Sequence, residues 1–181
     1  MSEKYKFVDP EGIYFVTPTI TAWIDIFTKP EYSEILVESL RYCQKEKGLI
    51  VHAWCIMSSH LHLIVSSRGD KLSSIFRDFK AFTSKQITKQ LYEGSDSRKE
   101  WMLSMFSSAA DKIKRNIHYK VWQDGNHPVL LDTNRMMEDR LNYLHQNPVE
   151  QGIVSTPEYY IYSSAQDYTG DKGPIEIELL D

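Results

Sequence analysis

The chain has 181 residues, with 21 Lys plus Arg, 25 Asp plus Glu and a formal net charge of −4. This length predicts one domain, residues 1–181, with a single sizeable core, and 41% hydrophobic with 25% charged residues excludes a disordered chain and a membrane protein. Taken alone, the acidic balance also argues against a nucleic-acid binder, because such proteins carry a basic surface.

The first half of the chain predicts three strands and one helix. Residues 12–23 are β-branched and aromatic, which predicts a strand, and Pro18 suggests an edge position or a bulge in it. Residues 30–47 start with proline, carry apolar side chains at helical intervals and end before Gly48, which is the usual punctuation of a helix. Residues 49–57 and 60–66 predict a hairpin of two strands.

The second half predicts mostly helix. A long helix starts at Asp70, residues 94–99 form a loop, and residues 100–113 predict another helix. Two short extended pieces follow within 118–131, and then a helix over 134–147 that Pro148 is expected to stop. The C-terminal tail is acidic from about residue 166, and we expect it to wrap the surface.

Strands interleaved with helices around a hairpin predict an α+β fold with a ferredoxin-like antiparallel sheet and helices packed on one face. We expect the other face to be free for a ligand. The two cysteines, Cys43 and Cys55, are too few for a disulfide scaffold and are expected to be buried. The N-terminus lacks the apolar core of a signal peptide, so a reduced, cytoplasmic protein is expected.

The sequence His60-Leu61-His62 starts the third predicted strand. Side chains two apart on a strand point the same way, so the two imidazoles project together and can share a divalent cation. A solvated pair of histidines with no ligand is the competing interpretation. A third ligand is still needed, and the sequence leaves carboxylates, amides and the other histidines open: His52, His118, His127 and His145.

The helix over 134–147 carries a polar stripe. Arg140, Tyr143 and Asn147 are spaced by three and four residues, so they share one face, next to an apolar stripe of Met137, Leu141 and Leu144 that is expected to face the core. From composition alone, Tyr143 is more often a half-buried surface tyrosine than a catalytic one, since the chain has 11 tyrosines.

Met57 to Val65 resembles the HUH motif, histidine–hydrophobic–histidine, and Tyr143 to Val154 resembles the nucleophile segment of single-tyrosine HUH transposases. The similarity is strongest to the REP-associated tyrosine transposases, relatives of small insertion-sequence transposases. The pair Trp122-Gln123, some twenty residues before the tyrosine, is similar to a Trp-Gln pair found in those proteins.

The resemblance implies a role for each matching residue. His60, His62 and Asn147 would bind a divalent metal, Mg or Mn, and Tyr143 would be the nucleophile that attacks a phosphodiester to leave a 5′-phosphotyrosine link. It also implies single-stranded DNA, often beside a hairpin, as the substrate. A metal next to the phenol and the phosphate suits this chemistry, because a phenol with a pKa near ~10 is a weak nucleophile. Gln123, His127 and Arg140 are further candidates for orienting the tyrosine or holding phosphates.

The net charge hides an asymmetry along the chain. Residues 71–120 carry 11 basic and 5 acidic side chains, an excess of +6, whereas residues 121–181 carry 3 basic and 11 acidic, an excess of −8. A local basic excess can form a DNA-binding surface on an acidic protein, although a solvated helix face is the commoner explanation. The candidate DNA-binding residues are Lys80, Lys85, Lys89, Lys114, Arg115, Lys120 and Arg140.

Three functions follow for comparison. The first is a metal-dependent DNA strand transferase, the second a non-catalytic nucleic-acid-binding module on the same fold, and the third a metal-dependent hydrolase in which Tyr143 is structural. Trp54 and Trp122 are candidates for stacking on bases, with Trp54 more often expected in the core. Insertion-sequence relatives form dimers that share active-site parts, whereas REP-associated ones need not, so the resemblance leaves a homodimer and a monomer open.

Overall fold

The computed structural model describes residues 6–113 and 117–180. Lys114 and Arg115, two of the candidate DNA-binding residues, lie outside the described residues. Apart from short 3₁₀ turns, the described part of the chain consists of β1 (Tyr14–Val16), α1 (Pro30–Lys47), β2 (Leu49–Ile56), β3 (Leu61–Ser67), α2 (Leu72–Glu93), α3 (Lys99–Asp111), β4 (Val129–Leu130) and α4 (Asn134–Glu150).

The four strands form one antiparallel sheet in the order β2-β3-β1-β4. Strand β3 lies between β1 and β2, and β1 lies between β3 and β4, so the chain builds two split βαβ units that interlock. This arrangement confirms the predicted α+β class and the ferredoxin-like antiparallel sheet. The helix predicted over 30–47 and the hairpin of the second and third strands are confirmed as α1 and β2–β3.

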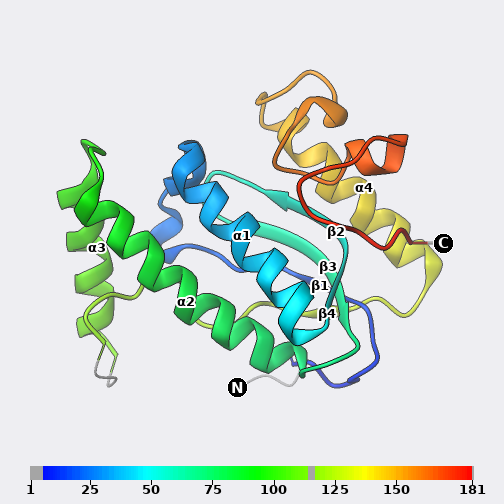
Figure 1. The fold of residues 1–181 in the computed structure, drawn as a ribbon, viewed down its shortest axis with the longest axis horizontal. Helices are drawn as coiled ribbons and strands as arrows, with labels where there is room; N and C mark the ends of the chain where they lie inside the picture. Colours follow the sequence, from blue (N-terminus) through cyan, green and yellow to red (C-terminus); the bar gives the residue numbers. More distant parts are fainter. Residues whose placement is uncertain (1–5, 114–116, 181) are drawn as a thin grey trace.

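Successive residues along the strands face two separate hydrophobic layers. Trp54, Leu63 and Val65 belong to the larger layer, which α1 and α2 cover. Ile64 and Phe15 point the opposite way and pack with Leu144 of α4. In Figure 1, α1 and α2 run side by side along the sheet, while α4 and the C-terminal segment lie apart from them. Both sheet faces therefore carry helices.

The expectation of a free second face is wrong. The apolar stripe of α4, with Met137, Leu141 and Leu144, has to be buried, and it is buried against the residues of the second layer. What stays accessible on this side is the edge of α4, where its polar stripe begins. The predicted core-facing role of the apolar stripe is confirmed.

Two predicted boundaries are wrong, both at a proline. The strand expected over 12–23 ends at Val16, since Pro18 has no N–H to donate and the chain continues only through single bridges at Thr19 and Ile20. The helix expected to stop before Pro148 continues to Glu150. There the Pro148 carbonyl accepts a hydrogen bond from the N–H of Ile153, so the helix end is satisfied by residues beyond the proline.

The C-terminal segment covers the open edge of β2. Backbone N–H groups of Ile56 and Glu178 donate to the carbonyls of Tyr162 and Val51, at 2.9 and 3.0 Å respectively, and the N–H of Ser164 donates to Trp54 at 2.9 Å. An exposed edge strand offers unpaired backbone groups to other chains. The tail therefore completes the sheet edge, as well as wrapping the surface as expected.

Both cysteines are buried, as predicted. Burial raises the pKa of the Cys43 thiol to about 11 and also raises the pKa of Cys55. In the described part of the chain, no helix combines the length and the hydrophobicity required to cross a bilayer.

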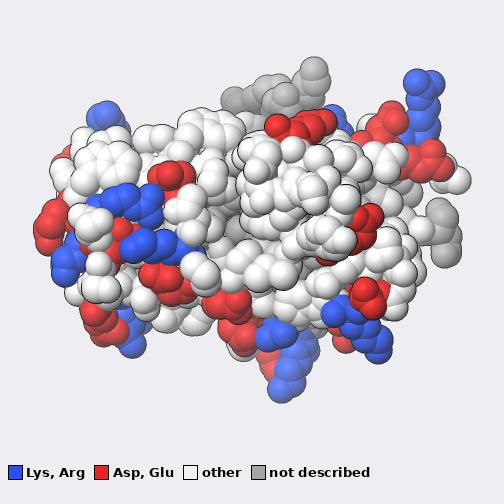
Figure 2. Space-filling view, turned by 90° about the horizontal axis from the view of Figure 1, so that it is seen from above, with Lys and Arg blue, Asp and Glu red and all other residues white. Residues whose placement is uncertain are grey.

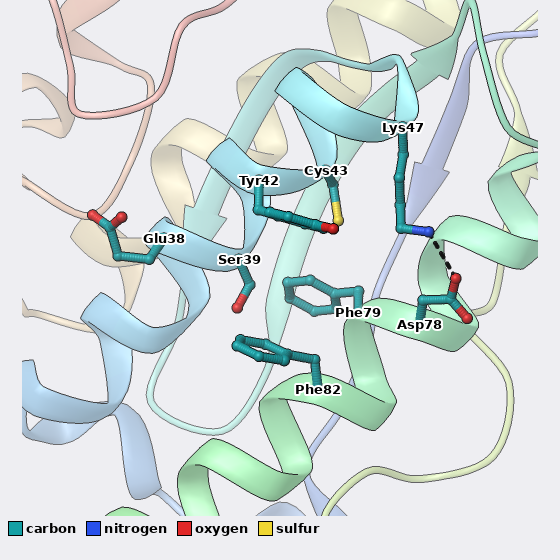
Figure 3. A pocket seen from close by; sticks show the side chains of 8 residues that line it. All are labelled: Glu38, Ser39, Tyr42, Cys43, Lys47, Asp78, Phe79 and Phe82. Atoms are coloured by element: carbon teal, nitrogen blue, oxygen red, sulfur yellow. Dashed lines mark hydrogen bonds and ion pairs between the residues drawn. The ribbon is translucent and has the colours of Figure 1, made fainter.

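A cavity of about 580 Å³ lies between α1 and α2, on the side of the molecule away from α4. Figure 3 shows Tyr42 and Phe82 facing each other across it, while an ion pair of 2.8 Å between Lys47 and Asp78 closes one end. Because the sheet separates this cavity from α4, it is no part of the histidine site described below.

His52 connects β2 to the C-terminal segment. Its Nδ1 donates to the carbonyl of Glu178 at 2.8 Å, and its Nε2 lies 2.9 Å from the hydroxyl of Ser66. The ring is buried, and this burial lowers the pKa of His52 despite the nearby Glu178 groups, which raise it. Both ring nitrogens thus have partners that fit a neutral imidazole.

We predict that acid weakens the fold through His52. Its pKa is lower in the folded chain than in the unfolded chain, where it is ~6.5, so the unfolded chain binds more protons as the pH falls below that value. The free energy of unfolding should therefore decrease from pH 7 towards pH 5, by urea denaturation, and the decrease should be shallower in His52→Gln. His118→Gln, which changes an exposed side chain, is the control. Equal pH slopes in wild type and His52→Gln would contradict the prediction.

Candidate active site

The two histidines of the predicted motif meet at the start of β3. His60 pairs with Thr19 in a single bridge just before the strand, and His62 lies within it, opposite Cys55. Leu61 and Leu63 are fully buried on the other face, as the alternation predicts. The Nε2 atoms of His60 and His62 are 3.1 Å apart. The rings therefore converge on one point, in the orientation that the sequence predicts.

Hydroxyl groups on both sides hold the two rings in this orientation. The Oγ1 of Thr17 lies 3.2 Å from Nδ1 of His62, and the Oγ of Ser59 lies 3.2 Å from Nδ1 of His60. When each Nδ1 carries the proton and donates it to its hydroxyl, each Nε2 keeps its lone pair directed at the point of convergence.

The electrostatics of the pair favour the neutral form. Burial, together with the neighbouring His60 and Arg140, lowers the pKa of His62 to about 3. Burial also lowers the pKa of His60. At neutral pH both imidazoles thus have lone pairs that can bind a cation.

Helix α4 brings its polar stripe to the histidines. The side-chain amide of Asn147 is buried, and its Nδ2 is 3.5 Å from Nε2 of His62. One turn further on, the amide of Gln151 donates to Oδ1 of Asn147 at 3.2 Å. Asn147 is therefore held on both sides. Its oxygen and nitrogen can exchange places by rotation of the amide, and that rotation would turn the oxygen towards the histidines.

Tyr143 lies beside this group with its ring half accessible to solvent. The ring is 42% exposed, and its centroid is 5.3 Å from that of His62 and 6.2 Å from that of Phe15. The guanidinium of Arg140 lies 5.0 Å over the Phe15 ring. The phenol and the guanidinium therefore flank the histidine pair on the α4 side, and His145, as expected, points away, with Nε2 2.8 Å from Oγ of Ser164.

The Trp122-Gln123 pair supports the site from behind. The amide of Gln123 donates to the carbonyl of Ile20 at 3.1 Å, while the N–H of Ile20 donates to the carbonyl of Ser59 at 2.9 Å. The indole N–H of Trp122 donates to Oγ1 of Thr83 at 2.9 Å. The segment from Thr17 to Trp23 is thus held between the turn that starts β3 and the Trp-Gln pair. Trp122 is 5% exposed and Trp54 is fully buried, so neither can stack on a base.

The donor set at this point is two imidazoles and one amide. Among the described residues, no three His, Cys, Asp or Glu side chains gather as a metal-binding group. Two Nε2 atoms 3.1 Å apart can both reach one ion at the usual distance of ~2.1 Å, and neutral imidazoles with an amide oxygen suit a divalent transition metal. These residues therefore fit a divalent cation. The other candidate third ligands His52 and His145 are engaged elsewhere, with Ser66 and Ser164 respectively.

Known proteins identify the family. A family model described as "Transposase IS200 like" matches residues 21–123. The chain belongs to the IS200-like transposase family. DNA transposition is thus its class of function, and DNA its partner. A comparison with curated proteins returns no significant match.

Two solved structures are similar to this transposase. The structure of a REP-associated tyrosine transposase bound to a REP hairpin shares 17% identity, with a TM-score of 0.65, and covers 100% of this chain and 94% of its own. At that identity it shows the fold. A candidate transposase from Deinococcus radiodurans R1 shares 15% identity over 81% of this chain and 97% of its own, with a TM-score of 0.43, which does not establish a shared fold.

The basic residues between β3 and α4 of this transposase differ in availability. Lys80 is tied down: its ammonium donates to the carbonyls of Gln123, at 3.0 Å, and Gly125, and burial lowers its pKa to about 8. Lys120 pairs with Asp124 at 2.6 Å. Lys85 and Lys89 are exposed on α2, with Glu93 3.9 Å from Lys89. Figure 2 shows a broad surface without charge beside mixed basic and acidic groups.

Sequence reasoning missed four supporting residues. Gln151 follows Asn147 by one turn, and the spacing would have indicated it if the helix had been extended past Pro148. Thr17, Ser59 and Phe15 carry no signal of their own, because they meet the histidines only through sheet pairing and the turn geometry. The Trp-Gln pair was found by resemblance, and its supporting contacts with Ile20 and Thr83 appear only in the fold.

We predict that Thr83→Val destabilises this support. Valine matches threonine in shape but leaves the buried indole N–H of Trp122 without an acceptor, which costs ~1–3 kcal/mol of unfolding free energy. Urea denaturation measures the loss. Thr88→Val is the matched control. Like Thr83, Thr88 donates its hydroxyl to the carbonyl four residues earlier on α2, but it does not bind the indole of Trp122. The same loss in both variants would contradict the role of the Trp122 bond.

Proposed function

We propose that this protein is a metal-dependent transposase that cleaves and rejoins single-stranded DNA through Tyr143. The observation that carries the proposal is the meeting of two distant segments. Tyr143 and Asn147 on α4 lie against the His60–His62 pair of β3, within one chain. A half-exposed phenol, a buried amide and two convergent imidazoles meet here, and these are the groups that the HUH resemblance assigns to the reaction.

His60, His62 and Asn147 would hold the divalent ion, Mg or Mn. When bound, the ion withdraws charge from the phosphate oxygens as the transition state forms. Around this site, Thr17 and Ser59 orient the two rings, and Gln151 contacts the amide of Asn147. The two rings are therefore preorganised and need not move to bind the ion, whereas the Asn147 amide would rotate to present its oxygen.

Tyr143 supplies the nucleophile. Its phenol oxygen forms a bond to phosphorus as the bond from phosphorus to the 3′ oxygen breaks, and the result is a 5′-phosphotyrosine and a free 3′ hydroxyl. The 3′ oxygen takes up a proton, and the phenol gives its proton to water, which its half-exposed ring can reach. Because the energy of the phosphoester is kept in the new link, a 3′ hydroxyl from another strand can reverse the step and complete strand transfer.

Several features support a DNA hairpin with single-stranded flanks as substrate. A protein of the same fold has been solved with a REP hairpin bound. Arg140 lies next to Tyr143 and can hold a phosphate, and Lys85 and Lys89 are exposed for a longer track. Lys80 and Lys120 contribute less, since their ammonium groups are engaged. Lys114 and Arg115 stay candidates for DNA binding. A cytoplasmic location and a homodimer remain predictions, and sedimentation analysis would test the homodimer.

The decisive test is a covalent adduct. We predict that a labelled single-stranded hairpin DNA with Mn²⁺ forms a denaturation-resistant protein–DNA adduct, seen as a shifted band on a denaturing gel. Tyr143→Phe should abolish the adduct because it removes the attacking oxygen, and His62→Ala or chelation with EDTA should reduce it at least ~100-fold. Tyr159→Phe is the control, since Tyr159 is a highly exposed tyrosine outside the site.

Each alternative gives a different result on that gel. Cleavage that persists in Tyr143→Phe without an adduct would indicate a metal-dependent hydrolase in which the tyrosine is structural. Binding of the hairpin by all variants, with neither cleavage nor adduct, would indicate a non-catalytic nucleic-acid-binding module.

We predict that Thr17→Val weakens metal binding without unfolding the protein. Loss of the hydroxyl removes the partner of Nδ1 of His62, and such supporting bonds are worth ~10–100-fold in metal affinity. Titration calorimetry with Mn²⁺ measures the change directly, in the absence of DNA. Thr19→Val is the matched control, because the Thr19 hydroxyl donates only to the Thr17 carbonyl in the same segment. Equal Mn²⁺ affinity in both variants would overturn the role of Thr17.

A further inference from the structure

Trp23 is an exposed tryptophan at the edge of the histidine site. Its side chain is 59% exposed, and its ring packs edge-on against His60, with centroids 5.5 Å apart and planes at 73°. The rings of Trp23, His60, His62 and Tyr143 therefore form a continuous row. Burial does not explain its position, because more than half of this large apolar side chain faces water.

The backbone under Trp23 is held in a costly conformation. Ala22 and Trp23 both have φ of 56°, in the left-handed region that non-glycine residues rarely adopt. Hydrogen bonds hold the turn in place: the N–H of Trp23 donates to Ile20 at 3.0 Å, and the N–H of Thr21 donates to Val121 at 2.8 Å. Strain of this kind persists where the surrounding structure imposes it and is often found at binding sites.

Of the four tryptophans, Trp23 is the one whose ring packs against the histidine pair. Trp54 and Trp122 are buried in the core, and Trp101 lies on α3, 51% exposed. The adjacent Asp25 does not disfavour DNA strongly, because its carboxylate pairs with Arg98 at 3.0 Å. An exposed indole that packs at the edge of the site is suited to a flat partner, and the base of an unpaired nucleotide is such a partner.

We propose that Trp23 stacks on one unpaired base of the single-stranded DNA, the base on the 5′ side of the phosphate that Tyr143 attacks. This proposal rests on the proposed function and names a binding subsite for its substrate. Single-stranded DNA binders use aromatic rings in this way, since every base has a face on which a ring can stack.

The side of the cut follows from the geometry of displacement. In an in-line reaction the attacking oxygen and the leaving oxygen lie on opposite sides of the phosphorus. Tyr143 lies at the His62 end of the row of rings and Trp23 at the His60 end. With the phosphate held at the histidines, the leaving 3′ oxygen and its nucleotide are directed towards Trp23. Stacking there would retain the cleaved 3′ end for rejoining.

The first test measures binding without chemistry. In a Tyr143→Phe background, Trp23→Ala should bind a short fluorescent single-stranded oligonucleotide about tenfold more weakly, by anisotropy, and Trp23→Phe should recover most of the affinity. Trp101→Ala, which changes a tryptophan of α3 that is also more than half exposed, should bind as the parent does. An oligomer of abasic deoxyribose phosphates should bind the parent and Trp23→Ala equally. Unchanged affinity of Trp23→Ala for the normal oligonucleotide would overturn the proposal.

The second test locates the base. After the cleavage position has been mapped on a hairpin substrate, a single abasic site is placed on its 5′ or its 3′ side. The abasic site on the 5′ side should slow adduct formation in the wild type and add no further loss in Trp23→Ala. Two results would contradict the assignment. One is a loss of rate from the 5′ abasic site that adds in full to the loss caused by Trp23→Ala. The other is a loss of rate from the 3′ abasic site that disappears in Trp23→Ala.

The two proposals fail in different ways. Adduct formation at the wild-type rate in Trp23→Ala, with unchanged oligonucleotide affinity, would refute the stacking subsite and leave the transposase reaction standing. Absence of any adduct, together with binding that depends on Trp23, would refute the reaction and leave a base-binding surface.

Discussion

The site depends on one short stretch of backbone pairing. Leu61 donates its N–H to the carbonyl of Pro18 at 3.0 Å, and Ile20 donates to the carbonyl of Ser59 at 2.9 Å. These two bonds join the segment after β1 to the turn that starts β3. They fix the register at which His60 and His62 face α4, and a shift by one residue would turn both rings towards the core. The same pairing brings the Thr17 hydroxyl to His62 and Trp23 to His60.

The second requirement is a helix held firmly over these rings. Leu144 anchors α4 in the smaller hydrophobic layer, and His145 contacts Ser164 of the C-terminal segment. Ser164 also accepts a hydrogen bond from the N–H of Trp54 in β2, at 3.0 Å. The C-terminal segment therefore connects α4 to the sheet that carries the histidines. The acidic tail, which begins just after Ser164 and which the motifs leave unexplained, pairs with β2 as well, through the N–H of Glu178 and the carbonyl of Val51.

The individual charges near the histidines describe this site better than the net charge of the chain does. The net charge of −4 disfavours a polyanion, yet no carboxylate is among the groups that perturb His60 or His62, whereas the nearby Arg140 does affect His62. Some of the basic side chains of residues 71–120 make hydrogen bonds within the protein, as Lys80 does with the carbonyls of Gln123 and Gly125. A DNA strand would therefore meet neutral aromatic and imidazole groups at the site, with the cations placed around them.

The sequence by itself determined the features that depend on local periodicity. Alternation along a strand predicted that His60 and His62 point together, and helical spacing placed Arg140, Tyr143 and Asn147 on one stripe. Tertiary structure decided the rest, because it depends on contacts between residues far apart in the chain. Local sequence patterns do not reveal such contacts. These contacts decide where the helix around Pro148 ends, that the second sheet face is covered, that Trp122 is buried and that Trp23 is exposed.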